Sequence, residues 1–207
     1  MNEKKLIAFD LYDTCIHHEK NLSDYKKIFS HKWISQDTIK NIWDILQKTP
    51  KNIEDVDFWL PQYLIDEINN LTQKNIATTV LYPDTIPTLE YLKSKWYKIA
   101  VISNLAQKYE IPLRSLFLKW IFDYEALSFN VGEIKPNPWI FENIKNKSWI
   151  DFKDMIMIWD KLDMDVRWAK NVWIDGIQID RTMKEKWPIY KEDYVKISTL
   201  SELKKIL

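Results

Sequence analysis

An apolar run ends directly in a carboxylate in the segment Lys5-Leu6-Ile7-Ala8-Phe9-Asp10-Leu11-Tyr12-Asp13-Thr14. Its apolar run, Leu6 to Phe9, is typical of a short strand that is buried on both faces of a parallel sheet. Asp10 follows this run directly, where a parallel sheet places its functional groups, beyond the carboxyl ends of its strands. An isolated aspartate at such a place often does no more than begin a turn. The interpretation of Asp10 therefore depends on what the rest of the chain brings beside it.

Further stretches of chemically active residues also close or follow apolar runs. They are Ile99-Ala100-Val101-Ile102-Ser103-Asn104, then Gly132-Glu133-Ile134-Lys135-Pro136-Asn137-Pro138, then Met155-Ile156-Met157-Ile158-Trp159-Asp160, which continues to Asp163 and Asp165. In chain order, the stretches supply a carboxylate, a hydroxyl, an ammonium group and an acidic cluster. We expect these groups to meet at the carboxyl edge of one sheet.

Strand-like and helical patterns alternate over the second half of the chain. Strands are predicted at Lys98–Ser103, near Phe122, and at residues 154–158, 173–179 and 194–197, with helices between them over residues 84–95, 113–118, from 138 onward and 165–171. Asp84 and Asn137 are the expected caps of two of these helices, and a capping box at residues 199–202 predicts a last one. The alternation predicts an α/β fold with a doubly wound, mostly parallel, Rossmann-like sheet.

Two helical stripes separate the first strand from this region. The first follows Ser35, a candidate N-cap, and the second follows a break at residues 49–52; their apolar members are Ile39, Ile42, Trp43 and Leu46, then Leu60, Leu64, Ile68 and Leu71. The simplest interpretation is a small helical module inserted after the first strand. The alternative is that both are ordinary core helices of a single domain.

Taken together, the four chemically active stretches resemble the motifs of the haloacid dehalogenase (HAD) superfamily of hydrolases, which contains many aspartyl-phosphate phosphatases. The resemblance covers residues 5–14 and residues 82 to 207, whereas residues 16–81 are similar to the small cap of that family only in length and helical character. It implies a core made of residues 1–15 and 82–207 and a helical cap insertion made of residues 16–81.

The resemblance also implies roles for individual acidic residues. The first aspartate of the family attacks phosphorus and binds magnesium, and both roles fall on Asp10. Mg²⁺ ligation further falls on Asp160 and Asp165, with Asp163 beside them. Elementary chemistry agrees, because a carboxylate that attacks a phosphate suffers like-charge repulsion, which a divalent cation held by acidic side chains offsets.

The phosphate-binding roles fall on the two middle motifs. Ser103 can donate a hydrogen bond to a phosphate oxygen, and the amide of Asn104 stands next to it. Lys135 supplies a positive charge that stabilises the negative charge developing on the phosphoryl group. The substrate implied by these roles is a small phosphorylated molecule.

The second position of the first motif departs from the phosphatase pattern. Phosphatases of the superfamily usually carry there an aspartate that protonates the leaving group and later activates water, and this chain has Tyr12. A tyrosine with a pKa of about 10 can donate a hydrogen bond at neutral pH but is a poor general base. Members of the superfamily that cleave carbon–halogen bonds resemble this chain at that position. Asp13 could act instead if the loop is bulged.

Three functions follow from these motifs. The first is a magnesium-dependent phosphohydrolase that uses Asp10, with Tyr12 and Lys135 as the other catalytic candidates. The second is a metal-independent 2-haloacid dehalogenase-type hydrolase in which Asp10 attacks carbon. The third is a non-catalytic, phosphate-binding protein that keeps the fold.

Composition narrows the partners. The chain has 30 basic and 30 acidic side chains and no long run of one sign, so nothing in it predicts binding to nucleic acid or to an anionic membrane surface. The sequence also contains no segment of the length and apolarity that crosses a membrane. Its single cysteine, Cys15, excludes an internal disulfide and suits a reducing compartment. We therefore expect a cytoplasmic protein; the sequence leaves its oligomeric state open.

The count of glycines is unusual. The 207 residues include 2 glycines and 11 tryptophans, although glycine normally supplies about 7% of residues and doubly wound folds use it in tight turns. Trp96, Trp159, Trp168 and Trp173 stand where the resembled family usually has glycine. One hypothesis is that such positions are glycine in the cell, because the gene uses a code that reads UGA as glycine. The alternative is a protein that is truly rich in tryptophan.

Overall fold

The structure is a computed structural model, and it describes residues 4–19, 34–161, 174–184, 188–191 and 194–207. Asp163, Asp165, Trp168, Trp173 and the helix predicted over residues 165–171 lie outside the described residues.

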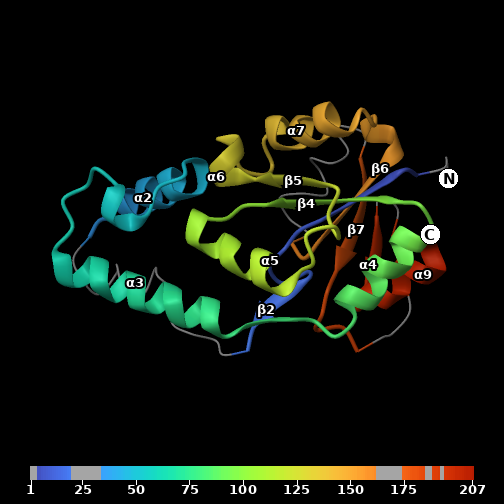
Figure 1. The fold of residues 1–207 in the computed structure, drawn as a ribbon, viewed down its shortest axis with the longest axis horizontal. Coiled ribbons are helices and arrows are strands. Elements are labelled where there is room, and N and C mark those ends of the chain that lie inside the picture. Colours follow the sequence, from blue (N-terminus) through green and yellow to red (C-terminus); the bar gives the residue numbers. More distant parts are fainter. Residues whose placement is uncertain (1–3, 20–33, 162–173, 185–187, 192–193) are drawn as a thin grey trace.

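A seven-stranded sheet forms the centre of the protein, in the order β5-β4-β1-β6-β7-β9-β8. Its neighbours pair in parallel, except for β8 and β9, which are antiparallel. The strands are β1 (Leu6–Phe9), β4 (Lys98–Ser103), β5 (Tyr124–Leu127), β6 (Met155–Trp159), β7 (Asp175–Ile179), β8 (Ile189–Tyr190) and β9 (Val195–Ile197). The predicted α/β fold with a mostly parallel, Rossmann-like sheet is thereby confirmed (Figure 1).

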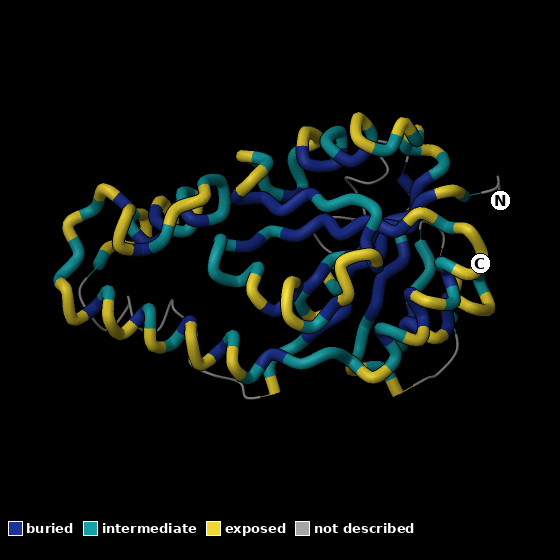
Figure 2. The backbone as a smooth tube through the Cα atoms, viewed as in Figure 1, coloured by how far each residue is buried: buried dark blue, intermediate teal, exposed yellow. Residues whose placement is uncertain are grey.

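Helices cover both faces of this sheet, and β1 shows why. Ile7 and Phe9 pack on one face against the helices of that side, and Leu6 and Ala8 pack on the other face against α7 (Pro138–Ser148). The helices on the first face are α4 (Thr85–Ser94), α5 (Ile111–Leu116) and α9 (Leu203–Ile206). A strand buried on both faces has no polar side, so it appears in the sequence as a continuous apolar run. Figure 2 shows the strands as the most deeply buried part of the backbone.

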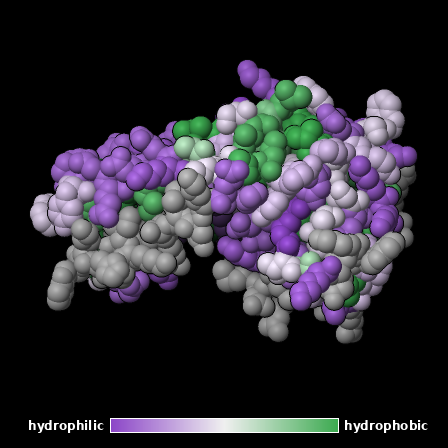
Figure 3. All heavy atoms as spheres, turned by 90° about the horizontal axis from the view of Figure 1, so that it is seen from below, coloured by the Kyte–Doolittle hydropathy of each residue, from purple (hydrophilic) through white to green (hydrophobic). Residues whose placement is uncertain are grey.

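A helical unit is inserted between β1 and α4. It contains α2 (Gln36–Lys48), a short 3-10 helix η1 (Ile53–Asp55) and α3 (Gln62–Ala77), and it projects from one end of the sheet domain (Figures 1 and 3). The two apolar stripes pack on each other in a separate hydrophobic cluster: Ile39, Ile42, Leu46, Ile53, Val56, Leu64 and Ile68. Ser35 caps α2 as predicted, since its hydroxyl accepts the backbone N–H of Thr38 at 3.1 Å.

A two-stranded antiparallel ribbon connects this unit to the sheet domain. The ribbon consists of β2 (Ile16–His18) and β3 (Thr79–Leu81), and the sequence did not predict it. The base of the ribbon is closed by the carbonyl of Cys15, which accepts the N–H of Tyr82 at 3.1 Å and the hydroxyl of Thr85 at 2.7 Å. The outgoing and returning chains of the insertion therefore lie side by side.

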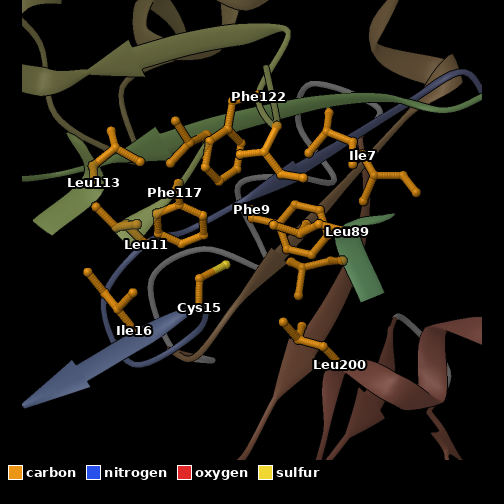
Figure 4. Close-up of a cluster of buried hydrophobic side chains, with 14 of the residues drawn as sticks. Ile7, Phe9, Leu11, Cys15, Ile16, Leu89, Leu113, Phe117, Phe122 and Leu200 are labelled. Carbon is orange, nitrogen blue, oxygen red and sulfur yellow. The ribbon is translucent and has the colours of Figure 1, made fainter. Parts of the chain in front are cut away.

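Several elements differ in detail from the prediction. The strand expected near Phe122 is β5 and begins at Tyr124, while Phe122 itself packs in the core against the Phe117 ring (Figure 4). Asp84 makes no side-chain cap on α4; its carboxylate binds Arg181 instead. The two-residue strand β8 was not predicted.

Two further predicted helix caps are confirmed. Asn137 caps α7, and residues 199–202 form a capping box at η4 (Leu200–Glu202), just before α9. The remaining elements are short: η2 (Gln107–Glu110), α6 (Ser128–Val131) and η3 (Phe152–Asp154). Among the described helices, none is long and apolar enough to cross a membrane.

Candidate active site

The candidate site is built around the carboxylate of Asp10, the first residue after β1. Ser103, the last residue of the neighbouring strand β4, donates its hydroxyl to Asp10 Oδ1 at 2.9 Å. The Lys135 ammonium lies 2.6 Å from Asp10 Oδ2, and the N–H of Leu11 donates to Oδ1 at 2.7 Å. The structure therefore brings together three of the predicted site residues from three separate stretches of the chain.

Lys135 reaches Asp10 because Asn104 fixes its backbone. The Asn104 side chain accepts the N–H of Lys135 at 2.7 Å and donates to its carbonyl at 3.0 Å. Both ends of this amide are thus used to hold the loop that carries the lysine. Asn104, which we expected to help bind phosphate, holds the backbone of Lys135 in place in this structure.

The ion pair between Lys135 and Asp10 is largely shielded from water. The side chain of Lys135 is 5% exposed and that of Asp10 is 17% exposed. A buried ammonium without a counter-charge is costly, so this lysine depends on the carboxylate or on another anion in its place. The arrangement is suited to receive a negatively charged group.

Asp160 lies at the end of β6, the strand on the other side of β1 from β4. Burial raises the pKa of its carboxyl group to about 6, and the negative charges of Asp10 and Asp13 add to the effect. Two carboxylates that are partly withdrawn from water and repel each other are the oxygen donors that a divalent cation prefers. Among the described residues, no group of three or more His, Cys, Asp or Glu side chains is arranged to hold a metal ion.

Tyr12 points its hydroxyl group at the backbone of η2. The hydroxyl donates to the carbonyl of Tyr109 at 3.2 Å, and the ring lies near the rings of His18 and Tyr109, with centroid distances of 5.2 and 5.9 Å. Burial raises the pKa of this phenol further above its ordinary value. At neutral pH, Tyr12 therefore acts as a hydrogen-bond donor and cannot serve as a base.

The loop that follows the nucleophile candidate turns sharply. Asp13 adopts the left-handed conformation, with φ of 59°, and its N–H donates to the carbonyl of Ile16 at 2.8 Å. Its side chain is exposed. Cys15 is fully buried among the core residues shown in Figure 4, and burial raises the pKa of its thiol, so it is a small core residue, as expected.

Sequence reasoning missed Arg181, which follows β7. Its guanidinium binds both carboxylate oxygens of Asp84 at 2.9 and 2.7 Å, donates to the carbonyl of Thr14 at 2.5 Å and lies 3.8 Å from the ring centroid of Tyr82. Arg181 thus contacts the chain on its way into the insertion and on its way back. No local motif identifies it, since its partners lie 97 and 167 residues away.

Comparison with known proteins identifies the family. The model of the family described as "haloacid dehalogenase-like hydrolase" matches residues 7–179, which include Asp10, Ser103, Lys135 and Asp160. The chain belongs to the haloacid dehalogenase-like hydrolases. It is therefore a hydrolase.

Individual relatives agree with this assignment. The chain is 30% identical over 151 residues to a glyceraldehyde 3-phosphate phosphatase of Methanothermobacter thermautotrophicus, a match that covers 70% of this chain and 67% of the relative. The structure of a HAD phosphatase from Thermococcus onnurineus has a TM-score of 0.65 and 27% identity, over 98% of this chain and 97% of that chain.

A third comparison concerns the fold alone. A HAD family enzyme from Bacteroides thetaiotaomicron, solved in complex with magnesium and inorganic phosphate, has a TM-score of 0.60 and 18% identity; the match covers 87% of this chain and 96% of that chain. The sheet of this hydrolase therefore has the same architecture as one that is known with those ligands.

Proposed function

We propose that this hydrolase is a magnesium-dependent phosphatase that acts on a small phosphorylated metabolite through an aspartyl-phosphate at Asp10. The observation that carries the proposal is the Asp10 carboxylate, which has the Ser103 hydroxyl on one oxygen and the Lys135 ammonium on the other. The similarity to a glyceraldehyde 3-phosphate phosphatase supports a phosphate ester as the substrate.

In the proposed reaction, a carboxylate oxygen of Asp10 attacks phosphorus, the bond between phosphorus and the ester oxygen breaks, and the leaving oxygen takes a proton from water to depart as an alcohol. Lys135 and Ser103 donate hydrogen bonds to the phosphoryl oxygens, where negative charge collects. Water then attacks the aspartyl-phosphate, which restores the carboxylate and releases inorganic phosphate. Tyr12 contributes at most a hydrogen bond, because its phenol keeps its proton at neutral pH.

The donor set fits a magnesium ion. Asp10 and Asp160 supply carboxylates from neighbouring strand ends, and Mg²⁺ typically takes one or two carboxylates together with water and substrate phosphate. Bound there, the ion would supply positive charge that offsets the repulsion between Asp10 and the phosphate. Asp165 is the further ligand that the family resemblance implies, and it lies outside the described residues.

We further propose that residues 16–81 form the cap of a core made of residues 1–15 and 82–207. The hydrophobic cluster of the insertion, which is separate from those of the sheet domain, supports this division. The insertion contacts the core at η2: Lys108 donates to Asn69 at 2.8 Å and to Glu54 at 3.2 Å, and Asn75 donates to the hydroxyl of Tyr109 at 3.2 Å. Tyr109 in turn receives the hydroxyl of Tyr12 on its carbonyl. The insertion thus contacts the residues that neighbour the nucleophile loop.

A second function is favoured by Tyr12, which takes the place of the usual second aspartate. A dehalogenase would use the same Asp10 on carbon and would need no metal. Release of halide from 2-haloacids without Mg²⁺ would support that function and overturn the first.

The test is a substrate panel of phosphate esters, with and without Mg²⁺, on the wild-type protein and on Asp10→Asn. We expect turnover that requires Mg²⁺ and is lost in Asp10→Asn while the thermal unfolding midpoint stays within a few degrees. Normal turnover by Asp10→Asn would contradict the mechanism. Transfer of labelled phosphate to the wild-type protein alone is the direct readout of the aspartyl-phosphate.

A further inference from the structure

Two tryptophans adopt a backbone conformation that favours glycine. Among the described residues other than glycine, φ is positive at Asp13, Trp96 and Trp149, with values of 59°, 68° and 59°. In this left-handed region the Cβ atom of an L-residue crowds the following carbonyl, and only glycine and short polar residues visit it routinely. Asp13 is such a short polar residue, and the two tryptophans are not.

Trp96 occupies the left-handed position of a Schellman motif at the end of α4. The N–H of Trp96 donates to the carbonyl of Lys93 at 2.9 Å, and the N–H of Tyr97 donates to the carbonyl of Leu92 at 3.2 Å. Tyr97 and Leu92 also belong to the same hydrophobic cluster, which is the apolar contact that usually accompanies this motif. The residue at this position is usually glycine, because glycine has no Cβ.

Trp149 ends α7 in the same way that glycine ends another helix of this chain. The N–H of Trp149 donates to the carbonyl of Lys145 at 2.9 Å, and the N–H of Gly132 donates to the carbonyl of Ser128 at 2.9 Å after α6. Gly132 is left-handed as well, with φ of 85°. Glycine thus occupies the equivalent position at the end of another helix in this chain.

The indole rings of Trp96 and Trp149 make no buried contacts that could offset the cost of the left-handed backbone. Trp96 is 91% exposed and Trp149 is 92% exposed, so neither buries apolar surface that could offset the conformational cost. Trp159 is different, because it is 1% exposed and packs in the core, 3.2 Å from the position a Cβ at Gly176 would take. The structure therefore distinguishes Trp96 and Trp149, which are exposed and have a positive φ, from Trp159, which is buried. The count of tryptophans alone does not make this distinction.

We propose that residues 96 and 149 are glycine in the protein that the cell makes. A UGA codon at both positions would account for this, because one variant genetic code reads UGA as glycine and another reads it as tryptophan. The chain has 2 glycines and 11 tryptophans, and the proposal concerns two of these tryptophans. The proposal makes no claim on Trp159, and Trp168 and Trp173 lie outside the described residues.

The direct test reads the gene and the native protein. We expect UGA at both codons and, in tryptic peptides of the protein isolated from its own cells, the mass of glycine at both positions. UGG at either codon, or a UGA codon whose peptide has the mass of tryptophan, overturns the proposal at that position.

A stability test examines the physical cause. Because the two turns are far apart in the sequence and lie on opposite faces of the sheet, Trp96→Gly and Trp149→Gly should each raise the thermal unfolding midpoint by about 2–4 °C, and the two effects should add. Asparagine, which tolerates the left-handed region, should give part of the gain at position 96, and alanine should give little.

Trp139 is the matched control. It is 65% exposed but lies in the first turn of α7, where the backbone is helical. Trp139→Gly should therefore lower the unfolding midpoint, since glycine destabilises a helix. A midpoint that does not rise in Trp96→Gly or Trp149→Gly, or that rises equally in Trp139→Gly, would show that the left-handed backbone is not the reason for glycine.

Discussion

At the level of single residues, Tyr12 limits proton transfer in the candidate active site. Its hydroxyl is used on the carbonyl of Tyr109, and burial raises its pKa, so it neither protonates a leaving group readily nor activates water. We expect hydrolysis of the aspartyl-phosphate to be slow. Tyr12→Asp should raise turnover of phosphate esters by about 10²-fold, because it supplies the missing acid and base. The measurement is steady-state kinetics with saturating Mg²⁺.

Tyr12→Phe is the control for that experiment. It keeps the ring that packs near His18 and Tyr109 and removes only the hydroxyl. We expect a loss of stability of about 1 kcal/mol from the missing hydrogen bond and less than about a tenfold change in turnover. If Tyr12→Phe were as inactive as Asp10→Asn, the phenol itself would be part of the chemistry.

The residues at strand ends could be placed from the sequence, for a physical reason. Asp10, Ser103 and Asp160 each follow or close a run of apolar residues, and parallel strands bring their carboxyl ends to one edge. Lys135 follows the short helix α6 rather than a strand, and its role came from the family resemblance. The role of Asn104 was not foreseen, because a bond from its side chain to the backbone of Lys135 leaves no trace in the spacing of residues.

At the scale of elements, Arg181 connects the nucleophile loop to the base of the insertion. It binds Asp84 ahead of α4 and the carbonyl of Thr14, and Asp84 also accepts the N–H of Leu200 at 2.7 Å. The side chains of Arg181 and Asp84 are only 16% and 13% exposed. The ribbon β2–β3 and this ion pair escaped prediction because both depend on contacts between residues far apart in the chain.

Removing this arginine should affect activity as well as stability. Arg181→Met leaves Asp84 without its cation, and we expect a loss of about 3 kcal/mol in the free energy of unfolding. Because Thr14 follows Asp10 closely in the same loop, we also expect turnover per folded molecule to fall at least about tenfold. Both are measured below the unfolding transition, by denaturant unfolding and by kinetics.

Arg114→Met is the matched control for Arg181→Met. Arg114 pairs with Glu110 and Glu125, but its side chain is 50% exposed, so water screens both ion pairs. Its loss should cost within about 1 kcal/mol and leave turnover unchanged. If Arg181→Met kept full turnover, the arginine would be structural only.

At the scale of the whole molecule, the insertion and the sheet domain have separate hydrophobic clusters, and their connection runs through the ribbon and η2. The periodicity of apolar residues predicted each cluster, since it reflects which face of a helix or strand is buried. It says nothing about how two separately packed units meet. The contacts of Lys108 and Tyr109 with the insertion were therefore visible only in the structure.

The burial of Asp160 and its repulsion by Asp10 should make the stability of the metal-free protein depend on pH. The pKa of Asp160 is about 6 in the folded protein, above its ordinary value of 3.8, because burial and the Asp10 charge disfavour the carboxylate. Between about pH 4 and 6 the folded state binds more protons than the unfolded state, so stability rises as pH falls through this window and the destabilising contribution is fully present above it. The carboxyl group is partly open to water, so we expect about 1 kcal/mol. Denaturant unfolding in the presence of a chelator measures the effect.

Asp160→Asn separates the contribution of this carboxylate from that of the rest of the protein. The substitution should remove the pH dependence and make the metal-free protein more stable at neutral pH. Saturating Mg²⁺ should stabilise the wild-type protein at neutral pH and the variant much less, because the ion would need both carboxylates. An equal gain in both proteins would mean that Asp160 is not a ligand.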